Sequence, residues 1–110
     1  MIRYAVSDDI EILKKYEHCI SEAELKNCIG LSRVLLMFEN GAFAGWLRFG
    51  LFWDNTPFMN MLYILDGFRG RGCGSRLVGF WENEMLAMGY KKVMTSTLSN
   101  ENAQFFYQNG

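Results

Sequence analysis

The sequence has little of what metal centres and disulfide frameworks need. Its only histidine is His18, and its three cysteines, Cys19, Cys28 and Cys73, are odd in number and lack Cys-x-x-Cys spacing. Structural zinc sites use four Cys or His ligands at characteristic spacings, so we expect no metal and reduced thiols. A chain of 110 residues can bury a core without such cross-links, which predicts a single domain over residues 1–110.

Long apolar segments and an excess of one charge are also missing. The longest strictly apolar run, Val34 to Phe38, is far shorter than the roughly 18 residues of a membrane span. The first residues lack the basic and then apolar order of a secretory signal. The formal net charge is -1, whereas sequence-independent nucleic-acid binding needs a broad basic face. We therefore expect a cytoplasmic protein with neither a membrane nor a nucleic acid as partner.

Local patterns predict a strand and two helices at the start of the chain. Arg3 to Val6 is a strand candidate. Ser7 can cap a helix whose first turn is acidic and whose last turn, near Tyr16, is basic, as the helix dipole favours. A capping-box pattern begins a second helix at Ser21, and Gly30 is its natural end.

Three strands should follow these helices. Asn40-Gly41 is the strongest short hairpin signal in the chain, and it predicts that Val34 to Phe38 and Ala42 to Trp53 pair antiparallel. The single proline, Pro57, is expected in a loop. Phe58 to Leu65 is the third, mostly apolar strand.

The hydrophobic period changes in the last third of the chain. Apolar residues recur there at helical spacing, which predicts a helix ending at Gly89 with one core-facing stripe made of Leu77, Trp81, Met85 and Met88. Alternation over residues 93–97 predicts another strand. Ser99 can then cap a short final helix that reaches Tyr107.

A glycine-rich segment connects the third of those strands to the long helix. Gly70, Gly72 and Gly74 stand on alternate residues, and Arg69 and Arg71 lie between and beside them. Glycines let a backbone approach an anion closely, and amides at a helix N-terminus point toward negative charge. The segment therefore predicts a phosphate or pyrophosphate site, although a flexible turn would also use glycines. It lacks the lysine of a Walker loop and the spacing of the dinucleotide fingerprint.

The same segment resembles the acyl-CoA-binding motif of the GNAT superfamily of N-acetyltransferases, which reads Arg or Gln, two residues, Gly, one residue, Gly or Ala. Residues 69–74 match every fixed position. Residues 100–107 are similar to the family's second block, with Asn, Ala and an aromatic-Tyr pair in order. The order of predicted elements also resembles the family's. The resemblance implies an α/β fold with a mixed sheet, the GNAT-like acyl-CoA N-acyltransferase fold, lacking its last two strands.

The resemblance also implies a reaction and a set of site residues. The acetyl group of acetyl-CoA would move to a primary amine by direct attack, with Tyr107 as the general acid that protonates the leaving thiolate. The implied cofactor-binding residues are Ile64, Leu65, Arg69, Gly70, Arg71, Gly72, Cys73, Gly74, Ser75 and Asn100. Amides near Ile64 and Leu65 would stabilise the oxyanion. The alternative function is a non-catalytic acyl-CoA-binding or sensor module.

The acceptor and the general base are not evident from the sequence. The acceptor would be a small-molecule or peptide amine. Glu17, His18 and Asp54 lie in segments that could border it, but each is more typical of a solvated surface group. Without the family's last strands, Lys92 to Leu98 would present an open edge, which predicts a homodimer.

Overall fold

The computed structural model describes residues 1–17, 20–52, 56–91 and 93–95. The elements in chain order are β1 (Ile2–Tyr4), the 3-10 turn η1 (Ser7–Asp9), α1 (Ile10–Tyr16), α2 (Glu22–Gly30), β2 (Val34–Glu39), β3 (Ala42–Phe52), β4 (Thr56–Ile64), the 3-10 turn η2 (Asp66–Phe68), α3 (Cys73–Ala87) and β5 (Met94–Thr95). The strands form one sheet in the order β1 to β5. Strands β1 to β4 pair antiparallel, and β5 pairs parallel with β4. The predicted mixed α/β fold is confirmed.

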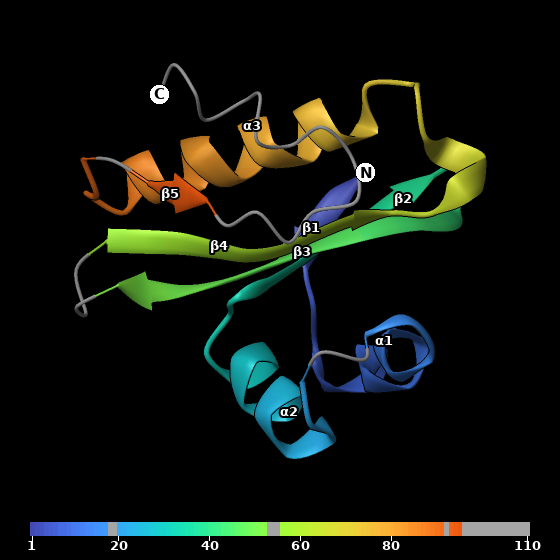
Figure 1. Cartoon of the computed structure of the whole chain (residues 1–110), viewed down its shortest axis with the longest axis horizontal. Coiled ribbons are helices and arrows are strands. Elements are labelled where there is room, and N and C mark those ends of the chain that lie inside the picture. The colour runs from blue at the N-terminus through green and yellow to red at the C-terminus, as the bar shows by residue number, and fades with distance from the viewer. Residues whose placement is uncertain (18–19, 53–55, 92, 96–110) are drawn as a thin grey trace.

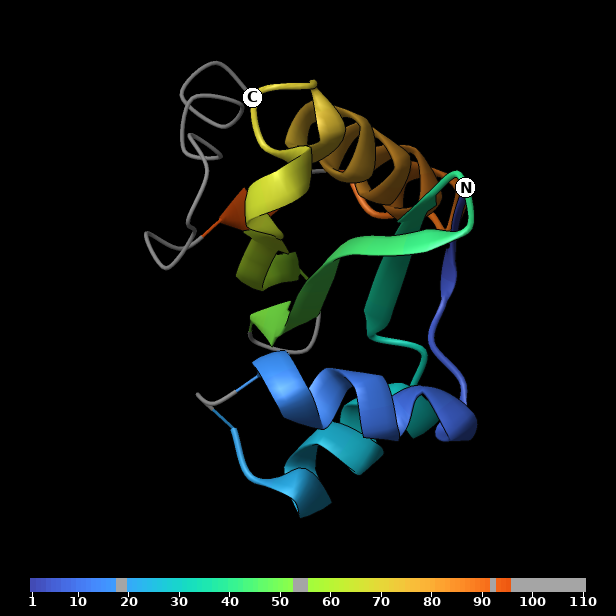
Figure 2. The same ribbon diagram turned by 90° about the vertical axis from the view of Figure 1, so that its right-hand side faces the viewer.

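Helices lie on both faces of this sheet. Helix α3 covers one face, and α1 and α2 lie together against the other (Figure 1). Figure 2, turned by 90°, shows the strands between these two helical layers. Each face of the sheet can thus bury apolar side chains against a helix. The loop from β4 to α3 lies at one end of the sheet, drawn in yellow in Figure 1.

Two local predictions are confirmed in detail. Asn40 and Gly41 have φ angles of 53° and 82°, the positive values of a type I′ turn, and they join β2 to β3. The Ser21 Oγ accepts a hydrogen bond from the Glu24 amide at 3.2 Å, which caps α2. Both features depend on residues close together in the chain.

The first helix begins later than predicted. Ser7 opens a 3-10 turn, and α1 begins at Ile10 and ends at Tyr16. Asp9 is the N-cap residue of α1, but its side chain accepts no hydrogen bond from the first turn of that helix. Its Oδ2 instead accepts from the Val6 amide at 2.7 Å, ahead of the 3-10 turn. The same carboxylate binds the guanidinium of Arg3 at 2.8 Å and 3.0 Å. This ion pair fixes the path from β1 into the helices.

Two further predictions are corrected. Met88 is 56% exposed and not part of the buried stripe, because α3 ends at Ala87 before the stripe reaches it. Pro57 lies in β4, opposite Leu51, and not in a loop. It stands next to the first residue of the strand, where the missing amide hydrogen of proline is tolerated.

A β-bulge interrupts the pairing of β3 with β4. The register shifts beside Asn60, which is the extra residue on β4. A bulge changes the side-chain alternation of a strand by one residue. Met59 before the bulge and Leu62 after it therefore both pack against the α3 side, whereas Tyr63 packs on the side of α1 and α2.

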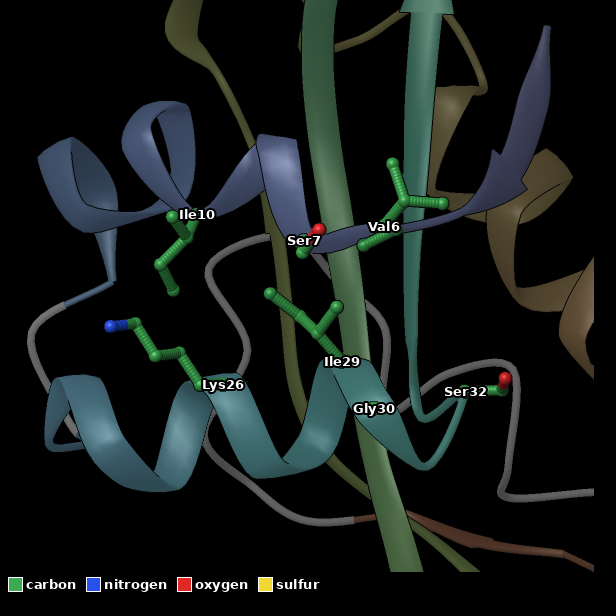
Figure 3. Close-up of a pocket in the computed structure, with 8 residues that line it drawn as sticks. Val6, Ser7, Ile10, Lys26, Ile29, Gly30 and Ser32 are labelled. Carbon is green, nitrogen blue, oxygen red and sulfur yellow. The ribbon is translucent and has the colours of Figure 1, made fainter.

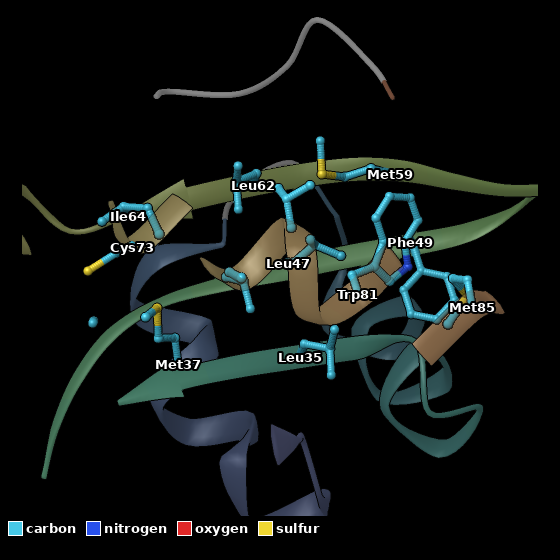
Figure 4. Close-up of a cluster of buried hydrophobic side chains, with 13 residues drawn as sticks. Leu35, Met37, Leu47, Phe49, Met59, Leu62, Ile64, Cys73, Trp81 and Met85 are labelled. Carbon is cyan, nitrogen blue, oxygen red and sulfur yellow. The ribbon is translucent and has the colours of Figure 1, made fainter. Parts of the chain in front are cut away.

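The core on the α3 side is apolar (Figure 4). Leu77, Trp81 and Met85 of α3 are all fully buried against the sheet. The Trp81 ring lies 5.7 Å from the ring of Phe49 on β3, measured between centroids. The predicted stripe thus forms the contact between α3 and the sheet.

The core on the α1 and α2 side includes charge. Trp46 of β3 is buried there, and its Nε1 donates to the Glu17 Oε2 at 3.0 Å. The Arg48 Nε donates to the same oxygen at 3.1 Å. Glu17 is 5% exposed and Arg48 is 9% exposed. The expectation that Glu17 is a solvated surface group was wrong, because it completes a buried ion pair.

Several predictions fall on residues outside the described part of the chain. The strand predicted over residues 93–97 is described as β5 for Met94–Thr95 only. The predicted final helix lies outside the described residues, and so do residues 92 and 96–98 of the predicted open edge, His18 and Asp54. None of the described helices has the length and apolar character needed to span a membrane.

Candidate functional site

The glycine-rich loop has the backbone geometry that its glycines predict. Gly70 and Gly72 both have φ of 76°, in the left-handed region that side chains with a Cβ avoid. A Cβ at either position would meet no atom within 4 Å, so backbone conformation and not crowding requires glycine there. Both glycines lie in the short segment that joins η2 to Cys73, the first residue of α3.

The N-terminus of α3 offers backbone amides at the end of this loop. Gly72 is the N-cap residue, and glycine has no side chain that could accept from the amides of the first turn. Within an α-helix the first amides have no carbonyl partner one turn earlier, and here these are the amides of Cys73, Gly74 and Ser75. The next one, that of Arg76, donates to the Gly72 carbonyl at 3.0 Å. The loop and helix together can therefore bind an anion.

Strand β3 supports the end of β4 through an unusually close approach. Gly45 pairs with Ile64, and a Cβ at Gly45 would overlap the Tyr63 carbonyl oxygen. Just beyond this pair, the Leu65 amide donates to the Ala44 carbonyl at 2.8 Å. That amide is engaged in the sheet, so an oxyanion role for it would require this hydrogen bond to open.

Arg69 is held by three groups at the end of β4. Its Nε donates to the Ile64 carbonyl at 2.8 Å, and its Nη1 lies 2.7 Å from the Asp66 Oδ1. Its guanidinium carbon lies 5.3 Å from the centre of the Tyr63 ring. The sequence predicted the charge of Arg69 at the loop, but not this set of contacts.

Arg71 has a different environment. It is exposed, and its guanidinium carbon lies 5.7 Å from the centre of the Phe68 ring. None of the carboxylates in the described ranges forms an ion pair with it. Its charge is therefore available to an anion at the loop, as the sequence predicted.

A polar cluster that the sequence did not indicate links the first turn of α3 to β2. The Arg76 guanidinium forms an ion pair with Glu39, and its Nη2 also lies 3.2 Å from the buried Cys73 sulfur. The hydrogen bond from Arg76 lowers the pKa of the Glu39 carboxyl. Glu39 and Arg76 are 37 residues apart in the chain, so no local pattern could identify the pair. It secures the start of α3 against the sheet.

The residues predicted around the acetyl group are only partly described. Ile64 ends β4, Leu65 follows it, and residues 69–75 form the glycine-rich loop and the first residues of α3. Asn100 and Tyr107 lie outside the described residues, so their roles stay predictions. In the described ranges, no three His, Cys, Asp or Glu side chains come together as ligands of a metal ion.

A cavity of about 440 Å³ lies elsewhere, between the start of the α1 segment and α2 (Figure 3). Its lining is mostly apolar, with Val6, Ile10 and Ile29 among its residues. The one cation in its described lining, Lys26, has its Nζ 3.2 Å from a Glu22 carboxylate oxygen. The cavity offers neither the amides nor the free charge of the loop, so we place the candidate site at the loop.

Comparisons with solved structures support this fold over the whole chain. The ribosomal-protein-alanine N-acetyltransferase of Brucella melitensis biovar Abortus 2308 matches with a TM-score of 0.75 and 13% identity, over 99% of this chain and 88% of that one. AAC(6')-Iy in complex with a bisubstrate analogue, CoA-S-monomethyl-acetylneamine, matches with a TM-score of 0.72 and 17% identity, over 99% and 87%.

A third structure contains the cofactor and a product. N-acetylglutamate synthase from Neisseria gonorrhoeae, complexed with coenzyme A and N-acetyl-glutamate, matches with a TM-score of 0.74 and 20% identity. The match covers 100% of this chain but 27% of the synthase. At these identities the likeness establishes the fold.

Sequence comparison establishes the family. No curated protein sequence matches this chain. The model of the acetyltransferase (GNAT) family, however, matches residues 4–110, which is nearly the entire sequence. The match includes the glycine-rich loop, the helices α1 to α3 and the strands β2 to β5. The chain therefore belongs to the acetyltransferase (GNAT) family.

Proposed function

We propose that this protein transfers the acetyl group of acetyl-CoA to a primary amine of a small molecule or peptide. The observation that carries the proposal is the loop between β4 and α3. It combines two left-handed glycines, the first amides of α3 and the charge of Arg71 in one short segment. Family membership supports acetyl transfer as the chemistry.

In this proposal the pyrophosphate of acetyl-CoA binds to the loop amides, from Arg71 to Ser75. Helix N-termini favour such groups, because their amides donate and the helix dipole is positive there. The pantetheine extends along the end of β4, beside Ile64 and Leu65, where Asn100 also contacts it. Holding the thioester in place lets the amine attack it directly, and proximity supplies much of the acceleration.

As the amide forms, the amine nitrogen loses a proton to solvent, and the C–S bond breaks. The leaving thiolate then needs a proton, and we assign its delivery to Tyr107. A phenol has a pKa of about 10, so it is protonated at neutral pH and similar in strength to a thiol. The comparison structures support an amine as acceptor, because two of their names specify N-acetylation of an amino group or its product. A cytoplasmic location and a homodimer remain predictions from the sequence.

Binding of CoA to the loop can be tested by calorimetry with a matched pair of variants. Gly72→Val and Gly89→Val both place a branched side chain at a positive φ, with no atom within 4 Å of the new Cβ. The two glycines lie at opposite ends of α3. We expect Gly72→Val to abolish CoA binding and Gly89→Val to retain it. Equal affinities in the two variants would refute the site.

Catalysis can be tested by measuring thiol release from acetyl-CoA with a panel of amines. The panel should include amino acids, aminoglycosides, polyamines and peptides with free N-termini. Release that requires both acetyl-CoA and one amine class supports the transferase. CoA binding without release for any amine would instead support the non-catalytic acyl-CoA-binding module.

The general acid has its own test. Tyr107→Phe removes the proton donor and keeps the ring, so we expect turnover to fall by about a hundredfold with little change in CoA affinity. Turnover equal to that of the unmodified protein, measured where chemistry limits the rate, would rule out this role.

A further inference from the structure

Two arginines stand next to the loop, but their surroundings differ. The guanidinium of Arg69 is engaged by the Ile64 carbonyl, the Asp66 carboxylate and the Tyr63 ring. The guanidinium of Arg71 contacts the Phe68 ring and forms no ion pair with a described carboxylate. Since both are arginines with the same charge, their contacts and not their residue type must separate their roles.

The contacts of Arg69 join the strand to the loop. Tyr63 and Ile64 are the last two residues of β4, and Asp66 begins the turn η2. Arg69 itself immediately precedes the left-handed Gly70. One planar side chain thus spans the junction from β4 into the glycine-rich segment.

The partner ring of Arg69 is itself fixed from the core. Tyr63 stacks on Trp46 with 5.0 Å between ring centroids and 18° between ring planes. Trp46 is fully buried, and its Nε1 is held by the buried carboxylate of Glu17. The ring against which Arg69 packs is therefore held by a buried neighbour and not by surface contacts alone.

A glycine-rich loop needs such support. Glycine loses more conformational entropy on ordering than any other residue, so a loop with left-handed glycines is costly to hold in one shape. Binding is tighter when the free protein already holds the bound shape. Contacts that order the loop before the ligand arrives therefore raise affinity without touching the ligand.

We propose that Arg69 is a positioning residue, which orders the glycine-rich loop against the end of β4, while Arg71 supplies the charge that meets the anion. This inference rests on the proposed function for the identity of the anion, the pyrophosphate of CoA. It changes the role of Arg69 from a phosphate ligand to a support for the backbone amides that bind the phosphate.

Substitutions by lysine and glutamine separate the two roles. Lysine keeps the charge but lacks the planar fork that bonds two partners and stacks on a ring. If Arg69 acts by position, Arg69→Lys and Arg69→Gln should both weaken CoA binding, each by about tenfold, the order expected for losing a charged hydrogen bond. If Arg71 acts by charge, Arg71→Lys should bind CoA more tightly than Arg71→Gln does.

Calorimetry at about 50 mM and about 200 mM salt adds a second criterion, because contacts to phosphate make binding salt-dependent. Arg71→Gln should flatten the salt dependence of CoA affinity. Arg69→Gln combined with Asp66→Asn removes one positive and one negative charge, so the net charge of the protein is unchanged. This double variant should therefore lower CoA affinity by the same factor at both salt concentrations. Full CoA affinity in Arg69→Lys would overturn the proposal.

Amide hydrogen exchange in the free protein tests the positioning role without any ligand. The amides of Leu65, Phe68 and Arg76 donate backbone hydrogen bonds at the two ends of the loop. These amides should exchange about tenfold faster in the Arg69→Gln and Arg69→Lys variants than in the unmodified protein. In Arg71→Gln their exchange should be unchanged. Unchanged exchange in both Arg69 variants would also overturn the proposal.

The stacking partner supplies an independent variant. Tyr63→Leu removes the ring beneath Arg69 and changes no charge, so it should accelerate exchange at the same amides. In an Arg69→Gln background, Tyr63→Leu should cause no further acceleration of exchange, because the contact between the guanidinium and the ring is already lost. If the unmodified protein fails to bind CoA, the proposed function is refuted, but the exchange measurements still decide the position of Arg69.

Discussion

The two faces of the sheet are buried in different ways. On the α3 face, one helix contributes an apolar stripe, and Trp81 packs there on Phe49. On the α1 and α2 face, two short helices cover the strands, and the buried core includes the ion pair of Glu17 with Arg48. Glu17 and Arg48 are the only buried charged side chains among the described residues.

The difference shows which parts of the molecule can change freely. An apolar interface tolerates exchange of one hydrocarbon side chain for another of similar volume. A buried ion pair does not tolerate loss of one member, because the other charge is then left without its partner in a poorly solvating site. The α1 and α2 face also holds Trp46 and, through it, Tyr63 beside the loop. The α3 face is thus buried by apolar packing alone, whereas the other face combines apolar packing with a buried ion pair that also contacts the residues beneath the loop.

The largest effect is expected on the α3 face. Trp81→Ala should lower the free energy of unfolding by about 3–5 kcal/mol, because it leaves a large cavity in a fully buried interface. Leu86→Ala, on the same helix at a residue that is 58% exposed, should change it by about 0.5 kcal/mol or less. Urea unfolding measures both. A loss below about 1 kcal/mol for Trp81→Ala would contradict close apolar packing between α3 and the sheet.

The second effect concerns the ion pair on the other face. Glu17→Ala should cost about 3 kcal/mol, because it deprives the buried Arg48 of this carboxylate. Glu17→Gln should cost less, since its amide oxygen can still accept from Trp46. Glu17→Leu combined with Arg48→Met should recover most of the loss. If the double variant is as unstable as Glu17→Ala, packing and not charge dominates this face.

A third prediction compares the stability changes caused by alanine at two glycines, one in β3 beneath the site and one in α3. Gly45→Ala should cost about 1–3 kcal/mol, because its Cβ would collide with the backbone of β4. Gly79→Ala should stabilise the protein by about 0.5–1 kcal/mol, since a Cβ there meets no atom within 4 Å and alanine favours the helix. Thermal unfolding of both variants checks the difference in sign.

The smallest effect comes from a polar contact at the rim of the α3 face. The Tyr4 hydroxyl donates to Glu84 at 3.0 Å, and burial together with this bond raises the pKa of Tyr4 to about 12. Tyr4 is thus more easily ionised in the unfolded chain. The contact of the protonated Tyr4 hydroxyl with Glu84 therefore contributes fully to folding stability below the unfolded pKa of about 10. This contribution is lost as the pH rises toward 12.

Comparison with Tyr4→Phe isolates this contribution. Between pH 9 and pH 11.5, the unmodified protein should lose stability relative to Tyr4→Phe by about 1 kcal/mol or less, since solvent screens a partly exposed contact. Urea unfolding at the two pH values measures the change. An equal pH dependence in both proteins would show that the contact with Glu84 has no effect on stability.

Much of the fold followed from local sequence signals. The Asn40-Gly41 turn, the Ser21 cap and the stripe of Leu77, Trp81 and Met85 were all predicted. The predicted start of α1 was wrong, because Ser7 opens a 3-10 turn and the α-helix begins only at Ile10. The bulge at Asn60 was not predictable either, since it depends on how two strands pair and not on the composition of one.

In the candidate site, too, some features followed from the local sequence and others from tertiary contacts. The glycines and arginines of the loop are adjacent in the sequence, so their spacing alone predicted an anion site before any tertiary contact was known. The support of that loop was decided by the tertiary structure. Gly45 meets Ile64, and Trp46 meets both Tyr63 and Glu17, only because the strands and α1 bring distant residues together.

The physical reason is the range of the forces involved. Turn geometry, helix capping and hydrophobic periodicity arise within a few residues, and the sequence by itself therefore determined the hairpin, the cap of α2 and the glycine-rich turn that we propose binds phosphate. Burial of a charge, or a close approach of two strands, depends on what lies across the sheet. Only the tertiary structure decided that Glu17 is buried with Arg48 and that Arg69 rests on Tyr63.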